Sequence, residues 1–146
     1  MQIIRQPKTS KEWEDYYQLR WKILRAPLNL DKGSEKDDLE ASSIHRAVFE
    51  DEQIIGVGRL HFIDKDKAQI RYMAILEEYR GKGLGKMLVE EFIQITKENK
   101  ISKIILYARE NVVNFYKKLG FDTVKKTHRL ESVQHFLMDK VIAKLY

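Results

Sequence analysis

Polar and apolar residues alternate along three successive stretches in the first half of the chain, residues 44–50, 53–63 and 68–76. A period of two predicts β-strands, because successive side chains of a strand point to opposite faces of a sheet. The polar segments 51–52 and 64–67 between them are typical of turns. We therefore predict an antiparallel meander of three strands. The third strand is apolar on both faces toward its end, as a central strand is.

Helical periodicity marks three other stretches. The first is expected over residues 9–25, where Thr9 and Glu12 have the spacing of a capping box. The second, 84–100, repeats apolar residues at helical spacing and keeps its other side polar. A short third helix is expected over 111–119, because a glycine follows it as a left-handed cap.

Further strands are expected at residues 2–6, 101–107, 121–130 and 134–145. The stretch 68–107 then forms a strand–helix–strand unit, a connection that joins parallel strands with right-handed crossover. The pattern as a whole predicts a mixed α/β fold with one central sheet. No linker, internal repeat or low-complexity tract interrupts the chain, so we expect a single domain over residues 1–146.

The composition fits a globular protein and excludes several kinds of site. Of 146 residues, 43% are hydrophobic and 34% are charged, with a formal net charge of +5. The absence of cysteine excludes disulfides, thiolate metal sites and a cysteine nucleophile. No run of roughly 18 apolar residues predicts a membrane span, and no signal-peptide core is seen, so a cytoplasmic location is expected. The positive charge suits an anionic ligand or nucleic acid, although well-mixed charges weaken the second alternative.

A glycine-rich turn joins the central strand to the second helix. It reads Arg80-Gly-Lys-Gly-Leu-Gly-Lys86, with glycine at every second position and cations between them. Glycines let a ligand approach the backbone, and a helix N-terminus offers unpaired N–H groups and partial positive charge. The turn is therefore a candidate seat for a phosphate or diphosphate, the alternative being a plain turn on a basic surface. The nucleotide P-loop and the dinucleotide fingerprint both fail on spacing.

Two segments resemble a known family. Arg80-Gly-Lys-Gly-Leu-Gly85 resembles motif A of the GNAT acyltransferase superfamily, and Phe115-Tyr-Lys-Lys-Leu-Gly-Phe121 is similar to the segment that closes many GNAT domains. Residues 19–30 with His45 are similar to a bacterial ElaA-like group within it. The resemblance covers nearly the whole chain. It implies one GNAT-like domain, with a mixed, mostly antiparallel twisted sheet of about six to seven strands flanked by about four helices.

The resemblance also implies a co-substrate, acetyl-CoA, and its binding residues. The diphosphate would lie on the glycine turn, the acetyl oxygen on a backbone N–H of the central strand, and Tyr116 would return a proton to the departing thiolate as general acid. The residues expected to contact the donor are Met73, Ala74, Ile75, Arg80, Gly81, Lys82, Gly83, Leu84, Gly85, Lys86, Asn111 and Tyr116.

Two positions depart from the family. Arg109 stands where many members carry an asparagine that contacts pantetheine, and the nearest asparagine is Asn111. Gln69 stands about where some relatives carry a glutamate base, and an amide cannot act as a base. The sequence therefore does not determine which residue acts as the general base that deprotonates the amine. Candidates are His45, His61, His128, His135, Glu35 and Asp37. The histidines lack ligand-type spacing, so no metal site is expected.

Residues 31–40 hold five acids and two bases within a basic protein. One interpretation is a mobile segment that attracts a cationic amine, and the other is a solvated polar face.

The expected activity is direct transfer of the acetyl group from acetyl-CoA to a primary amine, either of a small molecule or of a protein. The alternatives are a non-catalytic acyl-CoA binding or sensing module and a basic nucleic-acid-binding domain. Many relatives are dimers, so a homodimer stands beside a monomer as an alternative. The sequence does not identify the amine.

Overall fold

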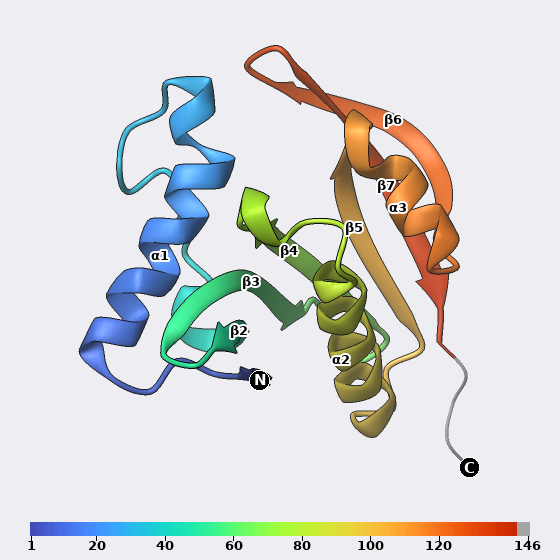
Figure 1. The fold of residues 1–146 in the computed structure, drawn as a ribbon. Helices are drawn as coiled ribbons and strands as arrows, with labels where there is room; N and C mark the ends of the chain where they lie inside the picture. The colour runs from blue at the N-terminus through green and yellow to red at the C-terminus, as the bar shows by residue number, and fades with distance from the viewer. Residues whose placement is uncertain (143–146) are drawn as a thin grey trace. The chain divides into compact units, whose positions relative to one another are not determined.

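The computed structural model describes residues 1–142, which form seven strands and three α-helices (Figure 1). The strands are β1 (Gln2–Arg5), β2 (Ile44–Glu50), β3 (Gln53–Phe62), β4 (Lys67–Ile75), β5 (Lys103–Arg109), β6 (Asp122–Leu130) and β7 (Val133–Val141). The helices are α1 (Ser10–Leu24), α2 (Leu84–Glu98) and α3 (Val113–Lys118), with short 3-10 helices at Ala26–Leu28, Glu40–Ser42, Glu77–Tyr79 and Glu110–Val112. The mixed α/β fold is confirmed. Positions 143–145 of the expected last strand lie outside the described residues.

The helix count differs slightly from the expected four. The connection at 28–43 holds only 3-10 turns at its two ends within the described chain. A proline at the start of the first turn and a left-handed Asn29 after it keep this segment from continuing as an α-helix.

The strands form one seven-stranded sheet in the order β1-β2-β3-β4-β5-β7-β6. β4 and β5 run parallel, with Lys67–Gln69 opposite Lys103–Ile105, because α2 carries the chain across between them. The pairs β1–β2, β2–β3, β5–β7 and β6–β7 are antiparallel. The prediction of a mixed, mostly antiparallel sheet is confirmed.

The chain divides into two compact units, and each is described by itself below. The first comprises residues 1–61 and 72–91, and the second comprises 62–71 with the chain from 92 onward. In the first unit, α1 packs its apolar side into a core with β2, β3, the end of β4 and the start of α2. Thr9 Oγ1 accepts a hydrogen bond from the Glu12 amide at 3.1 Å, which confirms the capping box.

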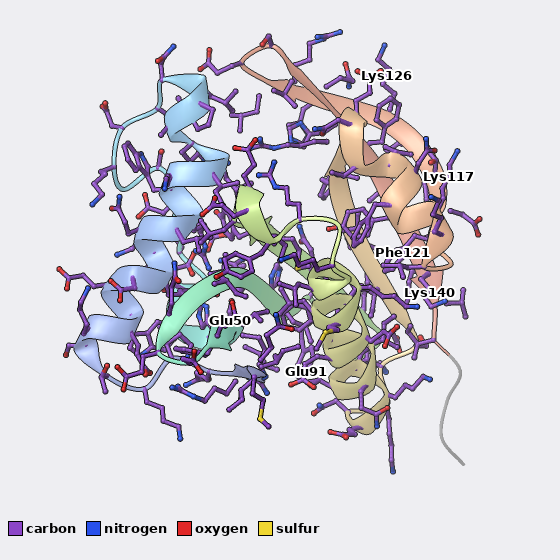
Figure 2. All side chains as sticks on the ribbon, viewed as in Figure 1. Glu50, Glu91, Lys117, Phe121, Lys126 and Lys140 are labelled. Carbon is purple, nitrogen blue, oxygen red and sulfur yellow. The ribbon has the colours of Figure 1, made fainter. Side chains whose placement is uncertain are left out.

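The second unit holds α3 against β5, β6 and β7. Its buried apolar residues include Ile104, Leu106, Phe121 and Met138. Gly120 ends α3 at φ +92°, and a Cβ there would collide with the side chain of Lys140, which Figure 2 labels. The end of the lysine side chain is flexible and could move aside, so it is the backbone conformation that requires glycine at this cap.

Candidate active site

The glycine turn before α2 has the backbone that the sequence pattern indicates. Gly81 has φ +77° and Gly83 has φ +83°, values that side chains other than glycine rarely adopt. A Cβ at either position would meet no atom within 4 Å. Conformation, rather than crowding, therefore demands these glycines, and the space beside them is open to a ligand.

Side chains around the turn fix it to its unit and make it electropositive. Arg80 Nε donates to the Ile75 carbonyl at 3.1 Å, which ties the turn to the end of β4. Leu84, the first residue of α2, is only 1% exposed and anchors the helix in the core. Lys86 and Lys82 are exposed, and Lys82 Nζ lies 5.3 Å from the centre of the Tyr79 ring. The turn thus presents backbone N–H groups and cations together, which suits a diphosphate.

β4 contains a backbone outlier that the sequence pattern did not reveal. Tyr72 has φ +60° and is 6% exposed. A bulky residue in the left-handed region is rare, above all inside a strand. It directly precedes residues 73–75, which were expected to contact the acetyl group. Beyond them, the Leu76 amide donates a hydrogen bond to the Ile55 carbonyl of β3 at 2.9 Å.

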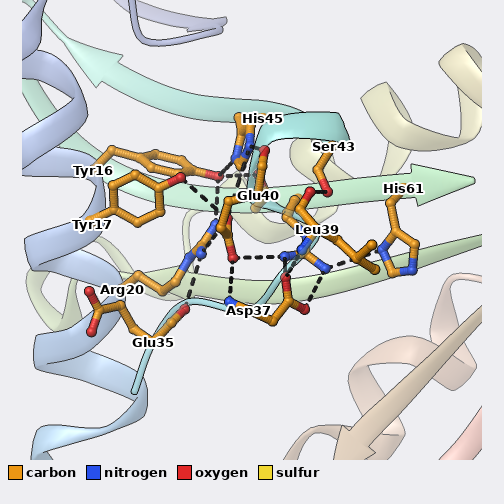
Figure 3. Close-up of polar contacts among 12 residues, drawn as sticks. Tyr16, Tyr17, Arg20, Glu35, Asp37, Leu39, Glu40, Ser43, His45 and His61 are labelled. Atoms are coloured by element: carbon orange, nitrogen blue, oxygen red, sulfur yellow. Dashed lines mark hydrogen bonds and ion pairs between the residues drawn. The ribbon is translucent and has the colours of Figure 1, made fainter. Parts of the chain in front are cut away.

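Two fully buried arginines form the centre of a polar network in the first unit (Figure 3). Arg20 Nη1 lies 2.9 Å from Glu40 Oε1. Arg59 Nη1 lies 2.8 Å from Glu40 Oε2 and 2.6 Å from Asp37 Oδ1. One carboxylate, Glu40, therefore bridges both guanidinium groups. Buried charges require such partners, because an unpaired one would be costly.

The network corrects both interpretations of the acidic run 31–40 for three of its five acids, while Asp31 and Asp38 are exposed. Glu35 is 4% exposed, and its carboxylate accepts a hydrogen bond from the Gly33 amide at 2.7 Å. Asp37 and Glu40 are paired with arginines. These three carboxylates therefore neither form a solvated face nor stand unpaired to attract cationic amines. The missed signal was the coincidence of an acidic run with arginine inside the otherwise apolar strand at 53–63.

His45 lies in the same network and is 3% exposed. Its Nε2 lies 2.7 Å from the Glu40 carbonyl oxygen, which can only accept, so Nε2 carries a proton. Its Nδ1 lies 2.9 Å from the Tyr16 hydroxyl, which donates its own proton to the Gly58 carbonyl oxygen at 2.9 Å. Burial lowers the pKa of His45, which keeps the ring neutral. The rings of Trp13, Tyr16 and Tyr17 contact it edge-on. With both nitrogens occupied, His45 is poorly placed to act as a base.

The second unit holds the remaining expected residues. Tyr116 on α3 is 6% exposed, between the rings of Phe115 and Phe121. Burial raises the pKa of Tyr116, so the phenol keeps its proton at neutral pH. Asn111 is exposed in the 3-10 turn before α3, and Arg109 ends β5.

Within residues 1–142, no group of three or more His, Asp or Glu side chains could hold a metal ion. No helix in this part of the chain is long and apolar enough to cross a membrane.

Comparison with known proteins decides the family. A sequence model described as the acetyltransferase (GNAT) family matches residues 9–121. The chain belongs to the GNAT acetyltransferase family. Membership makes it an acyltransferase, as the two sequence motifs implied.

Individual relatives agree with this assignment. The protein YyaT of Bacillus subtilis (strain 168) is 30% identical over 114 residues, which cover 78% of this chain and 76% of YyaT. The crystal structure of Escherichia coli ElaA has a TM-score of 0.82 at 18% identity, covering 96% of this chain and 99% of ElaA. An aminoglycoside 6'-N-acetyltransferase complexed with coenzyme A has a TM-score of 0.82 at 13% identity, covering 100% and 99%. These two structures show a shared fold.

Proposed function

We propose that residues 1–146 form one acyl-CoA N-acyltransferase domain, which transfers the acetyl group of acetyl-CoA directly to a primary amine. The observation that carries this proposal is the open glycine turn at the start of α2, within the segment that matches the family. The coenzyme A bound to the aminoglycoside 6'-N-acetyltransferase of similar fold supports the choice of donor.

The donor would bind through backbone groups and cations of the turn. The N–H groups at Gly83, Gly85 and the first turn of α2 suit the diphosphate, with Arg80, Lys82 and Lys86 supplying positive charge. The contact for the pantetheine arm would come from Asn111 or from Arg109, which stands at the position of the family's asparagine.

The reaction forms a C–N bond and breaks a C–S bond. The neutral amine attacks the thioester carbonyl, and a backbone N–H of Met73, Ala74 or Ile75 donates to the oxygen as it becomes negative. The thiolate of CoA then leaves, and Tyr116 gives it a proton. The phenol carries that proton at neutral pH. The nitrogen loses the extra proton that it carries after the attack, and transfer of that proton through water to the tyrosinate restores Tyr116.

The amine must lose a proton before it attacks, since alkylamines are mostly protonated at neutral pH. We do not assign this step to His45, whose ring nitrogens are both hydrogen-bonded. The proposal leaves this step to a relay through water or to another of the candidate groups.

Calorimetric titration with acetyl-CoA tests the donor site, with free CoA and ATP as controls. Micromolar binding of both CoA species with weak ATP binding is expected, and the absence of CoA binding would refute the proposal. Thiol release from acetyl-CoA in the presence of a panel of amines then tests catalysis. Tight binding without release for every amine would favour the non-catalytic sensing module. A cytoplasmic location and a homodimer are further parts of the proposal, and sedimentation velocity tests the dimer.

A further inference from the structure

Tyr72 needs an explanation, because its backbone is unfavourable for its residue type. At φ +60° inside β4, its side chain is crowded against its own main chain. Such conformations persist only where the surroundings enforce them, and they concentrate at functional sites. The enforcing groups should therefore be visible around the Tyr72 ring, which is almost fully buried.

Three guanidinium groups surround that ring. The central carbon of Arg20 lies 4.2 Å from the ring centre, that of Arg59 4.9 Å and that of Arg25 5.5 Å. We call these three residues the arginine clamp. Each distance is within the range of a cation–π contact, and such contacts strengthen when water is excluded. Two of the three come from α1 or its C-cap and one from β3, so the ring is held from two elements.

The acidic segment fixes the arginine clamp in turn. Glu40 bridges Arg20 and Arg59, and Asp37 holds Arg59 from a second side. Arg25 Nε donates to the Ser34 carbonyl at 3.1 Å. Ion pairs and hydrogen bonds with residues 34–40, including one that the Glu35 carbonyl accepts from Arg20 at 3.1 Å, thus set where the guanidinium groups lie.

Hydrogen bonding within the described chain leaves two nitrogen atoms of the arginine clamp without a partner. The Nε atoms of Arg20 and Arg59 are buried without a hydrogen-bond partner among residues 1–142. A network selected for stability alone would gain from apolar replacements, because buried ion pairs seldom repay their desolvation. The arrangement instead favours one position of the guanidinium planes.

We propose that the arginine clamp, fixed by Asp37 and Glu40, is a positioning device for the acetyl-binding backbone. It holds Tyr72 left-handed, and Tyr72 sets the direction of the N–H groups of the next three residues, 73–75. None of the clamp residues touches the reacting atoms. This inference rests on the proposed function, since it assigns those N–H groups to the acetyl oxygen. It also gives the acidic run a role in the reaction other than amine attraction.

Three variants test the clamp. Tyr72→Leu removes the aromatic face but keeps an apolar side chain. The matched control Tyr72→Phe keeps the face. The double variant D37N/E40Q keeps side-chain size and removes the charges that fix the arginines. Each is measured by hydrogen exchange of the peptide spanning 72–76, by CoA affinity, and by turnover of acetyl-CoA with the best amine of the panel.

The expected result is local. In Tyr72→Leu and in D37N/E40Q, exchange of the 72–76 peptide rises about tenfold relative to peptides of β2, as lost contacts loosen this segment first. Turnover falls by a similar factor, KM for acetyl-CoA changes little, and CoA affinity stays within about twofold, because the diphosphate seat is untouched. Tyr72→Phe, which keeps the aromatic face, changes exchange and turnover less than Tyr72→Leu does.

Two results would overturn the inference. One is exchange at 72–76 that is equal in Tyr72→Leu and Tyr72→Phe. The other is a rise that is uniform across the first unit, which would make the network a general stabiliser. Failure of the proposed function is distinguishable, because it appears as a parent protein that does not bind CoA at all. The exchange measurement needs no donor and stays informative in that case.

Discussion

Arg59 forms a bidentate pair with Asp37 through both of its terminal nitrogens: Nη1 lies 2.6 Å from Oδ1 and Nη2 lies 3.0 Å from Oδ2. This two-pronged geometry is the strongest form of arginine–carboxylate pairing. The guanidinium is fully buried, whereas the Asp37 side chain keeps 23% of its exposure. The pair therefore joins a buried strand to a segment that lies nearer the surface.

Removing the carboxylate should destabilise the protein. Asp37→Ala leaves the buried Arg59 charge with Glu40 as its remaining carboxylate, so we expect a loss of about 2 kcal/mol, below the about 3–5 kcal/mol of a fully broken buried pair. Urea unfolding measures this loss. The neighbouring exposed acid supplies the control, and Asp38→Ala should stay within about 0.5 kcal/mol of the parent. Equal effects of the two changes would show that the pair contributes nothing specific.

The buried imidazole predicts sensitivity to acid. Burial lowers the pKa of His45 in the folded state below its ordinary value. Between the two pKa values the unfolded chain binds a proton that the folded chain does not. Stability is therefore lost as pH falls below about 6.5, with a slope approaching about 1.4 kcal/mol per pH unit.

Unfolding free energies measured from pH 8 to pH 5 test this slope. His45→Gln keeps a donor for the Glu40 carbonyl but cannot titrate, so it should be less stable at pH 8 and show a shallower decline. His128→Gln, at an exposed position, is the control and should keep the parent slope. A parent curve as flat as that of His45→Gln would contradict the prediction.

The elements that sequence alone predicted are those with local causes. Thr9 and Glu12 predict the start of α1, because a capping box is formed by residues within four positions of one another. Gly120 predicts the end of α3 for the same reason, since the end of the helix depends on the φ of this glycine and on its neighbours in sequence. The glycine turn was recognised because its requirement, a positive φ at Gly81 and Gly83, is also local.

The arginine clamp could not be predicted in this way, because its partners are distant in sequence. Arg59 pairs with an acid 22 positions earlier, and nothing in the residue pattern fixes which acid meets which arginine. Tyr72 was assigned correctly to a strand, yet its left-handed backbone depends on contacts with Arg20 from another element. Apolar alternation predicts the strand but not a local break within it.

The phosphate seat gives a third prediction. Gly83→Glu fills the open space and adds a negative charge, so acetyl-CoA affinity should fall at least about 100-fold in a calorimetric titration. The change also strains the backbone, which has φ +83°. Gly33→Glu is the matched control, because Gly33 is also left-handed, at φ +105°, with open space around it. Similar affinity losses in both variants would assign the effect to strain and place the seat elsewhere.

The hydroxyl of Tyr116 gives the last prediction. Tyr116→Phe keeps the ring packed between Phe115 and Phe121, so stability and CoA affinity should change little. If the phenol protonates the departing thiolate, turnover falls about 10²-fold, the usual contribution of a positioned acid. The fall should shrink when a donor whose thiol has a lower pKa replaces acetyl-CoA, because such a thiolate leaves without help. Tyr107→Phe removes a half-exposed hydroxyl of the same unit and should leave turnover unchanged. Unaltered turnover in Tyr116→Phe would reduce this residue to a core tyrosine, and the proton would then have to come from water.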